Sequence, residues 1–442
     1  MIPAARTQAV VELLGAVEDS LARKGAAADA VLKSYFAKRR YAGSKDRAAV
    51  SDMLYRILRH RSRLAAGLGI AGAEATPRLM VLADLVMLAH SSDEGIAALF
   101  LGGKFAPEAL SEQEQGIVQG LRSVNQDHLP RHARLEYPEW MEGLLEARFG
   151  EAFEGELAAM DERAPVTIRA NALKIDRDAL RDRLDGEGIV TTHCRYALQG
   201  LVVEDGKGLT GTKTFKDGLF EVQDEGAQLA AILAEVEPSS QVLDLCAGAG
   251  GKTLALAAAM GNSGQLFAAD VDGKRLDELK RRTKRAGAHN VQPILLSEEG
   301  DGRRDRLADL NSRMDRVILD VPCTGTGTWR RNPELRWRFG PEDLETITAL
   351  QRRLLDEAAP LVKPGGRIVY ITCSLLRPEN EDQVSAFLGR HDGFKLMEYE
   401  LLLPDAVSGL PASLASLPGT LCMTPASHGT DGFFVAVLTK RS

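Results

Sequence analysis

The chain of 442 residues is 44% hydrophobic and 26% charged, which is typical of several globular domains with buried cores. Its formal net charge of -7 excludes a protein coated in basic residues, although it leaves room for a local basic face. The five cysteines include no Cys-x-x-Cys pair, so the composition predicts neither a disulfide framework nor a metal site.

The sequence shows no targeting or membrane signal. Its first residues contain no continuous apolar core and no cleavage signature. The apolar run between Leu79 and Ala89 contains Asp84 and is too short to cross a bilayer. We therefore expect a soluble, cytoplasmic protein that makes no contact with a membrane and acts as a monomer.

The first 130 residues are predicted to form an all-helical domain. Residues 7–22 and 47–68 both carry apolar residues at helical spacing. A second region, 135–235, combines a helical segment at 138–150 with short extended runs at 166–173, 200–205 and 218–224. This mixture predicts a small α+β region between the helices and the rest of the chain.

From residue 236 to 442 apolar strands alternate with helices. Strand patterns are expected at 241–246, 264–270, 291–296, 315–323, 365–373 and 431–440. Helical patterns follow most of them, at 252–260, 273–287, 341–362 and 378–390. Such alternation predicts an α/β domain with a mostly parallel sheet covered on both faces, whose ligand site lies at the carboxyl ends of the strands.

The stretch VLDLCAGAGGKT, residues 242–253, is the candidate ligand loop. A phosphate-binding loop requires glycine where Cys246 stands, and the dinucleotide fingerprint requires glycine where Thr253 stands. A third pattern fits better, with Asp244 followed by small residues at alternate positions, which lets the backbone approach a ligand. Asp270, one strand later, is placed to bind a ribose diol, although it could instead cap the next helix.

Two cysteine motifs follow the fourth and fifth predicted strands. With them, the chain resembles the NOP/Sun family of RNA (cytosine-5) methyltransferases, in its bacterial 16S ribosomal RNA branch. The motifs are DVPCTGTGTWRRNPELRWR at 320–338 and VYITCSLLRPENEDQV at 369–384. Residues 246–253 look like the donor loop of that family. Residues 168–174, 220–231 and 427–438 are similar to other segments of it, and residues 43–61 resemble its NusB-like RNA-binding domain.

The resemblance implies a class I S-adenosylmethionine-dependent methyltransferase with a Rossmann-like C-terminal domain and an all-helical NusB-like N-terminal domain. S-adenosyl-L-methionine is then the cofactor, and RNA, most directly ribosomal RNA, is the partner. The donor-binding residues that it implies are Cys246, Ala247, Gly248, Ala249, Gly250, Gly251, Lys252, Asp270 and Asp320.

The sequence departs from the family pattern at three places. Ala249 stands where proline is usual, and Val321 stands where alanine is usual. A third acid of the donor pocket is expected near residue 300, where Glu298, Glu299 and Asp301 all compete.

Carbon 5 of cytosine is a poor nucleophile, so covalent catalysis by a thiolate is expected. The resemblance assigns Cys373 as the nucleophile, Cys323 as the residue that assists product release, and Asp320 as the group that binds the cytosine edge. Lys252 is a candidate cation for the site, unless it is a solvated lysine of the next helix. Cys194 and Cys422 are expected to be small buried side chains.

A basic segment runs from Lys33 to Arg63, with ten Lys or Arg and two Asp residues, a net charge of +8. Arg56, Arg59 and Arg63 recur at helical spacing, which predicts one basic face for phosphate contact. Tyr35 and Tyr41 could stack on bases.

Three further groups could contact RNA. Residues 280–287 form a second basic run, which could equally be a solvated helix face. In the middle region Arg169, Asn171 and residues 223–225 are candidates to hold the RNA strand. Phe433 and Phe434 could form a stacking platform, although a buried last strand explains them as well.

Three alternatives remain open on the sequence. One is a methyltransferase that acts on transfer RNA. The second is a P-loop ATPase, for which residues 316–320 would supply the acidic strand end. The third is an RNA-binding factor without catalytic activity that keeps a methyltransferase fold.

Overall fold

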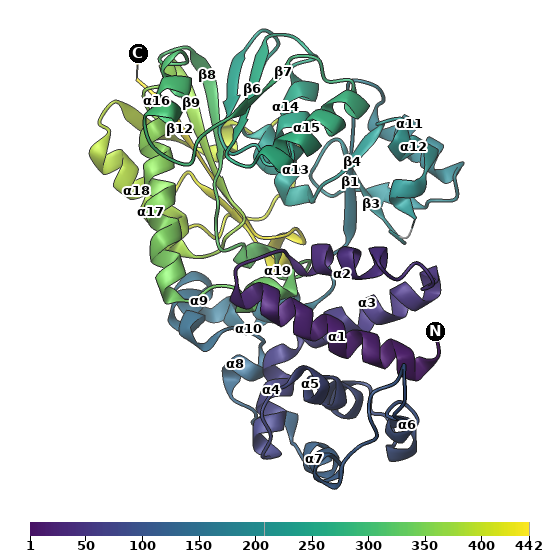
Figure 1. The fold of residues 1–442 in the computed structure, drawn as a ribbon. Coiled ribbons are helices and arrows are strands. Elements are labelled where there is room, and N and C mark those ends of the chain that lie inside the picture. The colour runs from purple at the N-terminus through teal and green to yellow at the C-terminus, as the bar shows by residue number, and fades with distance from the viewer. Residues whose placement is uncertain (207, 442) are drawn as a thin grey trace. The chain divides into compact units, whose positions relative to one another are not determined.

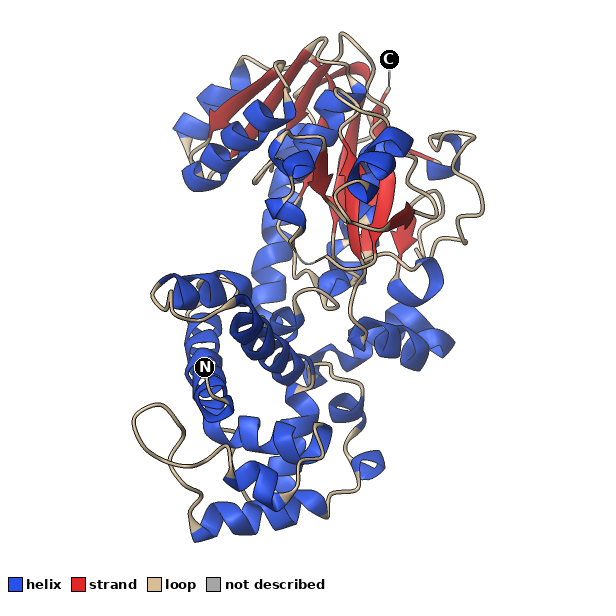
Figure 2. Ribbon diagram, turned by 90° about the vertical axis from the view of Figure 1, so that its right-hand side faces the viewer, coloured by secondary structure: helices blue, strands red, loops and turns tan. Residues whose placement is uncertain are grey.

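The computed structural model describes residues 1–206 and 208–441 and contains two compact units. The first, here called the helical unit, consists of Met1–Glu146, Phe153–Asp161 and Trp329–Gly340. The second, here called the sheet unit, consists of Ala147–Ala152, Glu162–Thr328 and Pro341–Ser442. All the strands of the described residues fall in the sheet unit (Figure 2). No helix in the described ranges is both long and apolar enough to span a membrane.

Helices alone build the N-terminal part of the helical unit, as the periodicity predicted (Figure 1). They are α1 (Pro3–Ala22), α2 (Ala28–Ala37), α3 (Ser44–Arg59), α4 (Arg61–Ile70), α5 (Pro77–Ala83), α6 (Asp93–Ala97), α7 (Glu112–Arg122) and α8 (Arg131–Arg134). A single turn of π-helix, η1 (Asp84–Leu88), continues α5. Leu13, Leu14 and Val17 of α1 join Leu54 and Ile57 of α3 in one buried cluster, so the apolar stripes of the two helices build the core.

The chain returns to the helical unit at residues 329–340, a segment expected to belong to the C-terminal domain. Here Trp329 and Arg336 are fully buried. The guanidinium of Arg336 donates to the carbonyl of Arg59 and, at 3.0 Å, to Asp161, which ends α10 (Phe153–Asp161). The carboxylate of Glu334 accepts from the backbone N–H of Ala28. Buried polar side chains bonded to helices far away in the chain explain why this segment packs with them.

Two sheets build the sheet unit, and the smaller one is antiparallel. Its strand order is β2-β3-β1-β4. The elements are β1 (Val166–Ala170), α11 (Arg177–Asp185), β2 (Thr191–His193), β3 (Gly200–Val203), α12 (Lys213–Lys216) and β4 (Phe220–Val222). Three of these strands were predicted, whereas β2 was missed because it is short and mostly exposed.

The larger sheet carries the predicted alternation, with the order β10-β12-β9-β8-β5-β6-β7 and β11 paired with β12. Its strands are β5 (Gln241–Asp244), β6 (Gln265–Asp270), β7 (Val291–Leu295), β8 (Met314–Asp320), β9 (Val362–Thr372), β10 (Phe394–Met397), β11 (Leu421–Met423) and β12 (Phe433–Lys440). Strands β5 to β9 pair in parallel, and β12 joins β9 antiparallel. The six predicted strands are confirmed, and the short β10 and β11 were not foreseen.

Helices separate the strands of the large sheet (Figure 1). They are α13 (Glu225–Ile232), α14 (Gly251–Ala259), α15 (Gly273–Ala286), α16 (Asp301–Ala308), α17 (Pro341–Ala358), α18 (Glu381–Arg390) and α19 (Pro425–His428); α9 (Glu142–Phe149) precedes α10. The chain passes from β5 outward to β6 and β7, then returns to β8 on the other side of β5. The carboxyl ends of β5 and β8 therefore flank the point where the strand order reverses, which is where doubly wound sheets bind ligands.

Candidate active site

The glycine loop joins β5 to α14 and needs glycine at two positions. Gly248 and Gly250 have φ of 55° and 88°, in the left-handed region that residues with a Cβ rarely adopt. A Cβ at Gly250 would also lie 3.0 Å from the side chain of Leu279. Gly250 precedes α14 without a side-chain cap. The amides of the first turn are therefore available to an anionic group, as at other helix N-termini.

Asp244 lies at the end of β5, directly before this loop. Its Oδ2 accepts a hydrogen bond of 2.7 Å from the hydroxyl of Thr253, whereas Oδ1 is buried and has no partner among the described residues. Burial raises the pKa of Asp244 to about 7; Thr253 opposes the shift, and the nearby charge of Asp320 adds to it. A buried acceptor without a partner, beside a loop of backbone amides, fits a ligand that carries both a donor and an anion.

Asp270, at the end of β6, holds the same loop. Its two carboxylate oxygens accept 2.8 Å hydrogen bonds from the backbone N–H groups of Gly248 and Asp272. The N-cap of α15 is Asp272, whose carboxylate accepts from Lys274 and Arg275. The alternative that Asp270 itself caps the helix is therefore wrong.

An open pocket of about 800 Å³ lies at the ends of β6 and β7, and Asp270 lines it. Among the three acids that compete for the third donor position, only Glu298 lines this pocket. Glu299 pairs with Arg353 at 2.6 Å, and the exposed Asp301 pairs with Arg304 at 3.2 Å. The pocket therefore favours Glu298, which sequence reasoning could not separate from its neighbours.

The other residues of the predicted donor loop hold the loop in place. The backbone N–H of Ala247 donates 2.9 Å to the carbonyl of Ala269, and the carbonyl of Ala249 accepts from Arg282. Burial raises the pKa of the Cys246 thiol well above its ordinary value, which leaves it poorly suited to act as a nucleophile. These contacts fix the loop to β6 and α15.

The two cysteines of the predicted motifs meet at the carboxyl ends of β8 and β9. Their Sγ atoms are 3.4 Å apart, and both side chains are partly exposed. The contact with Cys373 and the surrounding protein raise the pKa of the Cys323 thiol well above its ordinary value. The loops that carry them are joined by a hydrogen bond from the N–H of Gly327 to the carbonyl of Cys373. Parallel strands placed side by side thus bring together residues 50 positions apart in the chain.

Asp320, at the end of β8, forms an ion pair with Lys252, with Nζ 2.7 Å from Oδ2. The Lys252 side chain is 9% exposed, and its Nζ lies 5.2 Å from the centre of the Phe433 ring. The alternative of a solvated lysine is therefore wrong. The structure brings Lys252 to Asp320, and so places a cation beside the acid that the resemblance assigns to cytosine.

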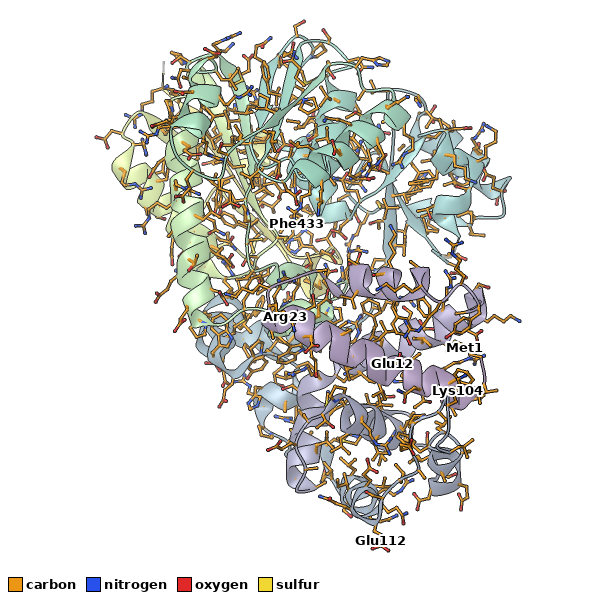
Figure 3. The ribbon with its side chains drawn as sticks, viewed as in Figure 1. Met1, Glu12, Arg23, Lys104, Glu112 and Phe433 are labelled. Carbon is orange, nitrogen blue, oxygen red and sulfur yellow. The ribbon has the colours of Figure 1, made fainter. Side chains whose placement is uncertain are left out.

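Phe433, labelled in Figure 3, begins β12 in the sheet unit. It is buried, as is Phe434. Phe434 packs against the ring of Tyr370, with the ring centres 6.4 Å apart. The interpretation of a buried last strand is confirmed, and no stacking platform is present at these two residues. Cys194 and Cys422 are also buried, as expected.

The middle-region candidates for RNA contact are structural. Arg169 is buried and donates to Gln223 at 2.7 Å, and Asn171 is buried and donates to the carbonyls of Gly218 and Ala286. Within 223–225, Asp224 caps α13 and Glu225 accepts from two backbone N–H groups. These side chains bond to one another or to the backbone of the protein, and most of them are buried, which speaks against the expectation that they hold an RNA strand.

The basic run 280–287 lies at the end of α15, and its two inward arginines are paired. Arg282 and Arg285 both bind the buried carboxylate of Glu221, at 2.9 and 2.6 Å. Lys280 and Arg281 form ion pairs with acids one turn earlier on the same helix. The alternative of a helix face with local ion pairs describes this run better than a second RNA patch.

The predicted face of Arg56, Arg59 and Arg63 is also used inside the protein. Arg56 makes two 2.6 Å hydrogen bonds to the fully buried Asp84. Arg59 donates to the carbonyl of Asp161, and Arg63 to the carbonyl of Arg134. Arg56 and Arg59 lie on α3, whereas Arg63 lies on α4 beyond the break at His60, so the predicted single helix face does not form. Each guanidinium is bonded within the helical unit, which leaves less basic surface for phosphate contact than expected.

The earlier part of the same segment stays at the surface. Lys33, Lys38, Arg40 and Lys45 are exposed and form no ion pair with the residues that the structure describes. Tyr41 beside them is 71% exposed. Tyr35, in contrast, donates to Glu12 of α1 (labelled in Figure 3), and the guanidinium of Arg39 stacks on its ring at 3.6 Å. The exposed basic surface is therefore smaller than expected.

Glu379 is a site residue that sequence reasoning missed. Its fully buried carboxylate accepts hydrogen bonds from Thr324 and Ser374, the residues that follow the two cysteines. The signal was a glutamate within the second cysteine motif, but its neighbours in the chain do not reveal that it is buried.

The doubly wound sheet and its glycine loop define a Rossmann-like methyltransferase. A family model described as 16S rRNA methyltransferase RsmB/F matches residues 230–439, and a model of the ferredoxin-like domain of RsmF/B-like methyltransferases matches residues 137–209. The chain belongs to the RsmB/F family.

Individual relatives support the same assignment. The chain is 36% identical over 333 residues to the probable ribosomal RNA small subunit methyltransferase B of Synechocystis sp., a match that covers 75% of this chain and 73% of the relative. It is 29% identical over 412 residues to ribosomal RNA small subunit methyltransferase B of Pseudomonas syringae pv. tomato, covering 90% of each. The crystal structure of PH0851 matches with a TM-score of 0.81 and 28% identity, over 100% of this chain and 99% of that one.

Proposed function

We propose that this protein transfers a methyl group from S-adenosylmethionine to carbon 5 of a cytidine in RNA, through a covalent cysteine–cytosine intermediate. The observation that carries the proposal is the pair of thiols 3.4 Å apart at adjacent strand ends, in a chain of the RsmB/F family. Cytosine-5 chemistry needs a thiol that adds to the ring and a group that helps to remove it, and two neighbouring thiols supply both.

The donor would bind along the glycine loop and the pocket at β6. The free amides of the first turn of α14 suit its carboxylate, and the unpaired Oδ1 of Asp244 suits its ammonium group. Asp270 and Glu298 line the pocket where the ribose and the adenine would lie. When bound, S-adenosylmethionine supplies an electrophilic methyl group.

Cys373 acts as the nucleophile. Its thiolate adds to carbon 6 of cytosine, and the electron density that reaches carbon 5 forms the new bond to the methyl carbon. The bond between that carbon and the sulfonium sulfur breaks at the same time, and its electron pair leaves with S-adenosylhomocysteine. A base then removes the proton from carbon 5, and the Cys373 thiolate leaves as the double bond re-forms. The resemblance assigns release to Cys323, whose sulfur lies 3.4 Å from that of Cys373, within reach of the proton transfers of that step.

Asp320 and Lys252 form the polar side of this site. Asp320 binds the edge of the cytosine at nitrogen 3 and the exocyclic amine, and its 35% exposed carboxylate is accessible for that contact. Lys252 holds the carboxylate in place through the 2.7 Å ion pair. Negative charge that develops on the ring during thiolate addition is stabilised by such fixed polar groups.

RNA binding involves the helical unit, which we propose is a NusB-like domain. The exposed cations between Lys33 and Lys45, with Tyr41 among them, provide phosphate contacts and one base-stacking group. A base inside a stacked helix cannot reach a thiol, so the target cytidine is unpaired or flipped out of the helix. The names of the relatives support small-subunit ribosomal RNA as the substrate.

The test is methyl transfer from labelled donor to purified 16S ribosomal RNA, with methylated cytidines mapped in cells with and without the gene. We expect loss of 5-methylcytidine at one or a few ribosomal positions. Loss confined to transfer RNA would favour the transfer-RNA alternative. RNA binding without any transfer would indicate a factor that keeps the fold without the activity, and magnesium-dependent ATP hydrolysis would restore the ATPase alternative.

A further inference from the structure

Glu379 connects the two loops that carry the reactive thiols. It lies in η8 (Arg377–Glu379), between β9 and α18, and is completely buried. Its Oε1 accepts from the backbone N–H of Thr324 at 2.8 Å and from the amide of Gln351 at 3.1 Å. Its Oε2 accepts from the hydroxyls of Thr324 and Ser374.

Two of these partners directly follow the cysteines. Thr324 follows Cys323. The side-chain amide of Gln351 also donates a 2.9 Å hydrogen bond to the carbonyl of Pro322, the residue before Cys323. Ser374 follows Cys373. One carboxylate thus reaches both thiol loops at once.

The neighbouring side chain of Asn380 completes the second loop. It accepts from the hydroxyl of Thr372 at 2.6 Å and donates to the carbonyl of Ser374 at 2.9 Å, so it spans the residues on either side of Cys373. The hydroxyl of Tyr370 donates 2.6 Å to the backbone carbonyl of Glu379 and fixes the turn beneath. The glutamate is therefore itself held rigidly.

The hydrogen-bond pattern fits an ionised carboxylate. A backbone N–H and an amide NH₂ can only donate, and two hydroxyls provide the remaining donors, which fills all four acceptor positions. Burial raises the pKa of Glu379, and these donors oppose that shift. A buried carboxylate satisfied in this way is costly to remove, because the backbone N–H of Thr324 then loses its acceptor and the two hydroxyls lose a charged one.

We propose that Glu379 is a positioning residue that holds the thiols of Cys323 and Cys373 at the separation that the reaction requires. The catalytic consequence rests on the proposed function, whereas the positioning itself does not. Without this carboxylate the loops keep the Gly327–Cys373 bond and the contact between the hydroxyls of Thr324 and Ser374, but they lose the buried group that bonds to the residues after both cysteines. Displacement by about 1 Å is enough to slow a reaction about 100-fold.

The thiol separation can be measured without methyl transfer. Diamide oxidises two adjacent thiols to a disulfide, taking two electrons and two protons, and the reaction requires both sulfurs at bonding range. In the full-length protein we expect rapid loss of two free thiols and a Cys323–Cys373 disulfide detectable by peptide mass. In Glu379→Ala this reaction is expected to be at least several-fold slower, and in Glu379→Gln intermediate, because glutamine retains an acceptor for Thr324 and Gln351.

Glu381 supplies a matched control two residues away. It is also buried and binds Arg148 through a bidentate ion pair, and it reaches the Cys373 loop only indirectly, through the bond from Arg148 to the carbonyl of Leu375. Glu381→Gln is therefore expected to lower the melting temperature while the rate of disulfide formation stays as in the wild type. If Glu379→Ala does not fold, Thr324→Val and Ser374→Ala remove single donors, and we expect each to slow disulfide formation.

Methyl transfer is measured on the same variants. A slower single-turnover rate in Glu379→Ala with unchanged donor affinity supports the positioning role. Wild-type disulfide kinetics in Glu379→Ala, or in both Thr324→Val and Ser374→Ala, would overturn it. Slower disulfide formation in a protein whose wild type transfers no methyl group would support the positioning and contradict the proposed function.

Discussion

Lys252 and Asp320 form a 2.7 Å ion pair that joins the first turn of α14 to the end of β8. The lysine is almost buried and approaches the ring of Phe433, whereas the carboxylate remains accessible. The pair therefore presents an oriented acid to the surface of the site while its cation is held inside. In the sequence Lys252 looks like the lysine of a phosphate-binding loop, whereas in the structure it pairs with Asp320.

The first prediction concerns this ion pair. Lys252→Met removes the cation and leaves Asp320 free to reorient, so methyl transfer is expected to fall by about 100-fold, a typical contribution of one oriented acid–base group. Single-turnover assays with labelled donor measure the rate, and Lys216→Met, an exposed lysine on α12, is the control. A Lys252→Met enzyme with the full rate would remove the ion pair from the mechanism.

Removal of each thiol is predicted to block a different step of the reaction. Cys373→Ala cannot form the bond to carbon 6, so methyl transfer should drop to background. Cys323→Ala should still attack and methylate, but release slowly, which leaves a covalent enzyme–RNA band on a denaturing gel that needs both RNA and S-adenosylmethionine. Cys246→Ala, in the donor loop, is the control and should trap nothing.

The reverse outcome has a clear meaning. If Cys373→Ala traps RNA and Cys323→Ala is inactive, Cys323 is the nucleophile. The double variant should give no band in either case. Full activity of both single variants would contradict the two-thiol mechanism.

Asp270→Ala is predicted to weaken donor binding. It removes the acceptor expected for the ribose and also releases the Gly248 amide that shapes the loop. Hydrogen bonds to a charged group contribute about 1.5–3 kcal/mol, so calorimetry should show affinity reduced by about 10- to 100-fold. Asp176→Ala, which removes the N-cap of α11, controls for loss of a loop carboxylate. Unchanged affinity in Asp270→Ala would exclude a role in donor binding.

Asp244 predicts a pH dependence of stability. Its pKa is raised from 3.8 to about 7, so the folded protein binds a proton at Asp244 more tightly than the unfolded chain does. Protonated Asp244 therefore adds to the free energy of unfolding at low pH, and this stabilisation is lost as the pH rises from 4 to 7. Asp244→Asn cannot ionise. We therefore expect the variant to gain stability relative to the wild type between pH 5 and pH 8, by about 2 kcal/mol.

Urea unfolding of the donor-free protein at the two pH values measures this difference. A constant offset between Asp244→Asn and the wild type would show that Asp244 is already ionised at pH 5. Thr253→Val, which removes the hydroxyl donor to Asp244, should raise its pKa further and shift the transition to higher pH.

The basic surface predicts the salt dependence of RNA binding. Lys38→Ala, Arg40→Ala and Lys45→Ala together remove exposed cations, so the slope of log K against log salt should become shallower by about 0.7–0.9 for each phosphate that the variant no longer neutralises. Arg56→Ala is the control, because it breaks the internal pair with Asp84 and should lower stability without changing the slope. An unchanged slope in the triple variant would remove this surface from the RNA interface.

The sequence by itself determined the helical N-terminal region, six of the large-sheet strands and the motifs at their carboxyl ends. These features are local, because hydrophobic period and turn residues within a short window report secondary structure. Parallel pairing then requires that strand ends meet at one edge, so Asp244, Asp320, Cys323 and Cys373 could be expected to gather there.

Only the tertiary structure decided which charged and polar side chains face the solvent. Arg56 bonds to Asp84, Asn171 to the carbonyl of Ala286, and Glu379 to Thr324. The partners in each pair lie far apart in the chain, so the pattern of a short window does not predict them. A buried polar group must have a partner, and the identity of that partner depends on which elements the fold brings together. For that reason the basic face was overestimated, and the carboxylate that holds both thiol loops was missed.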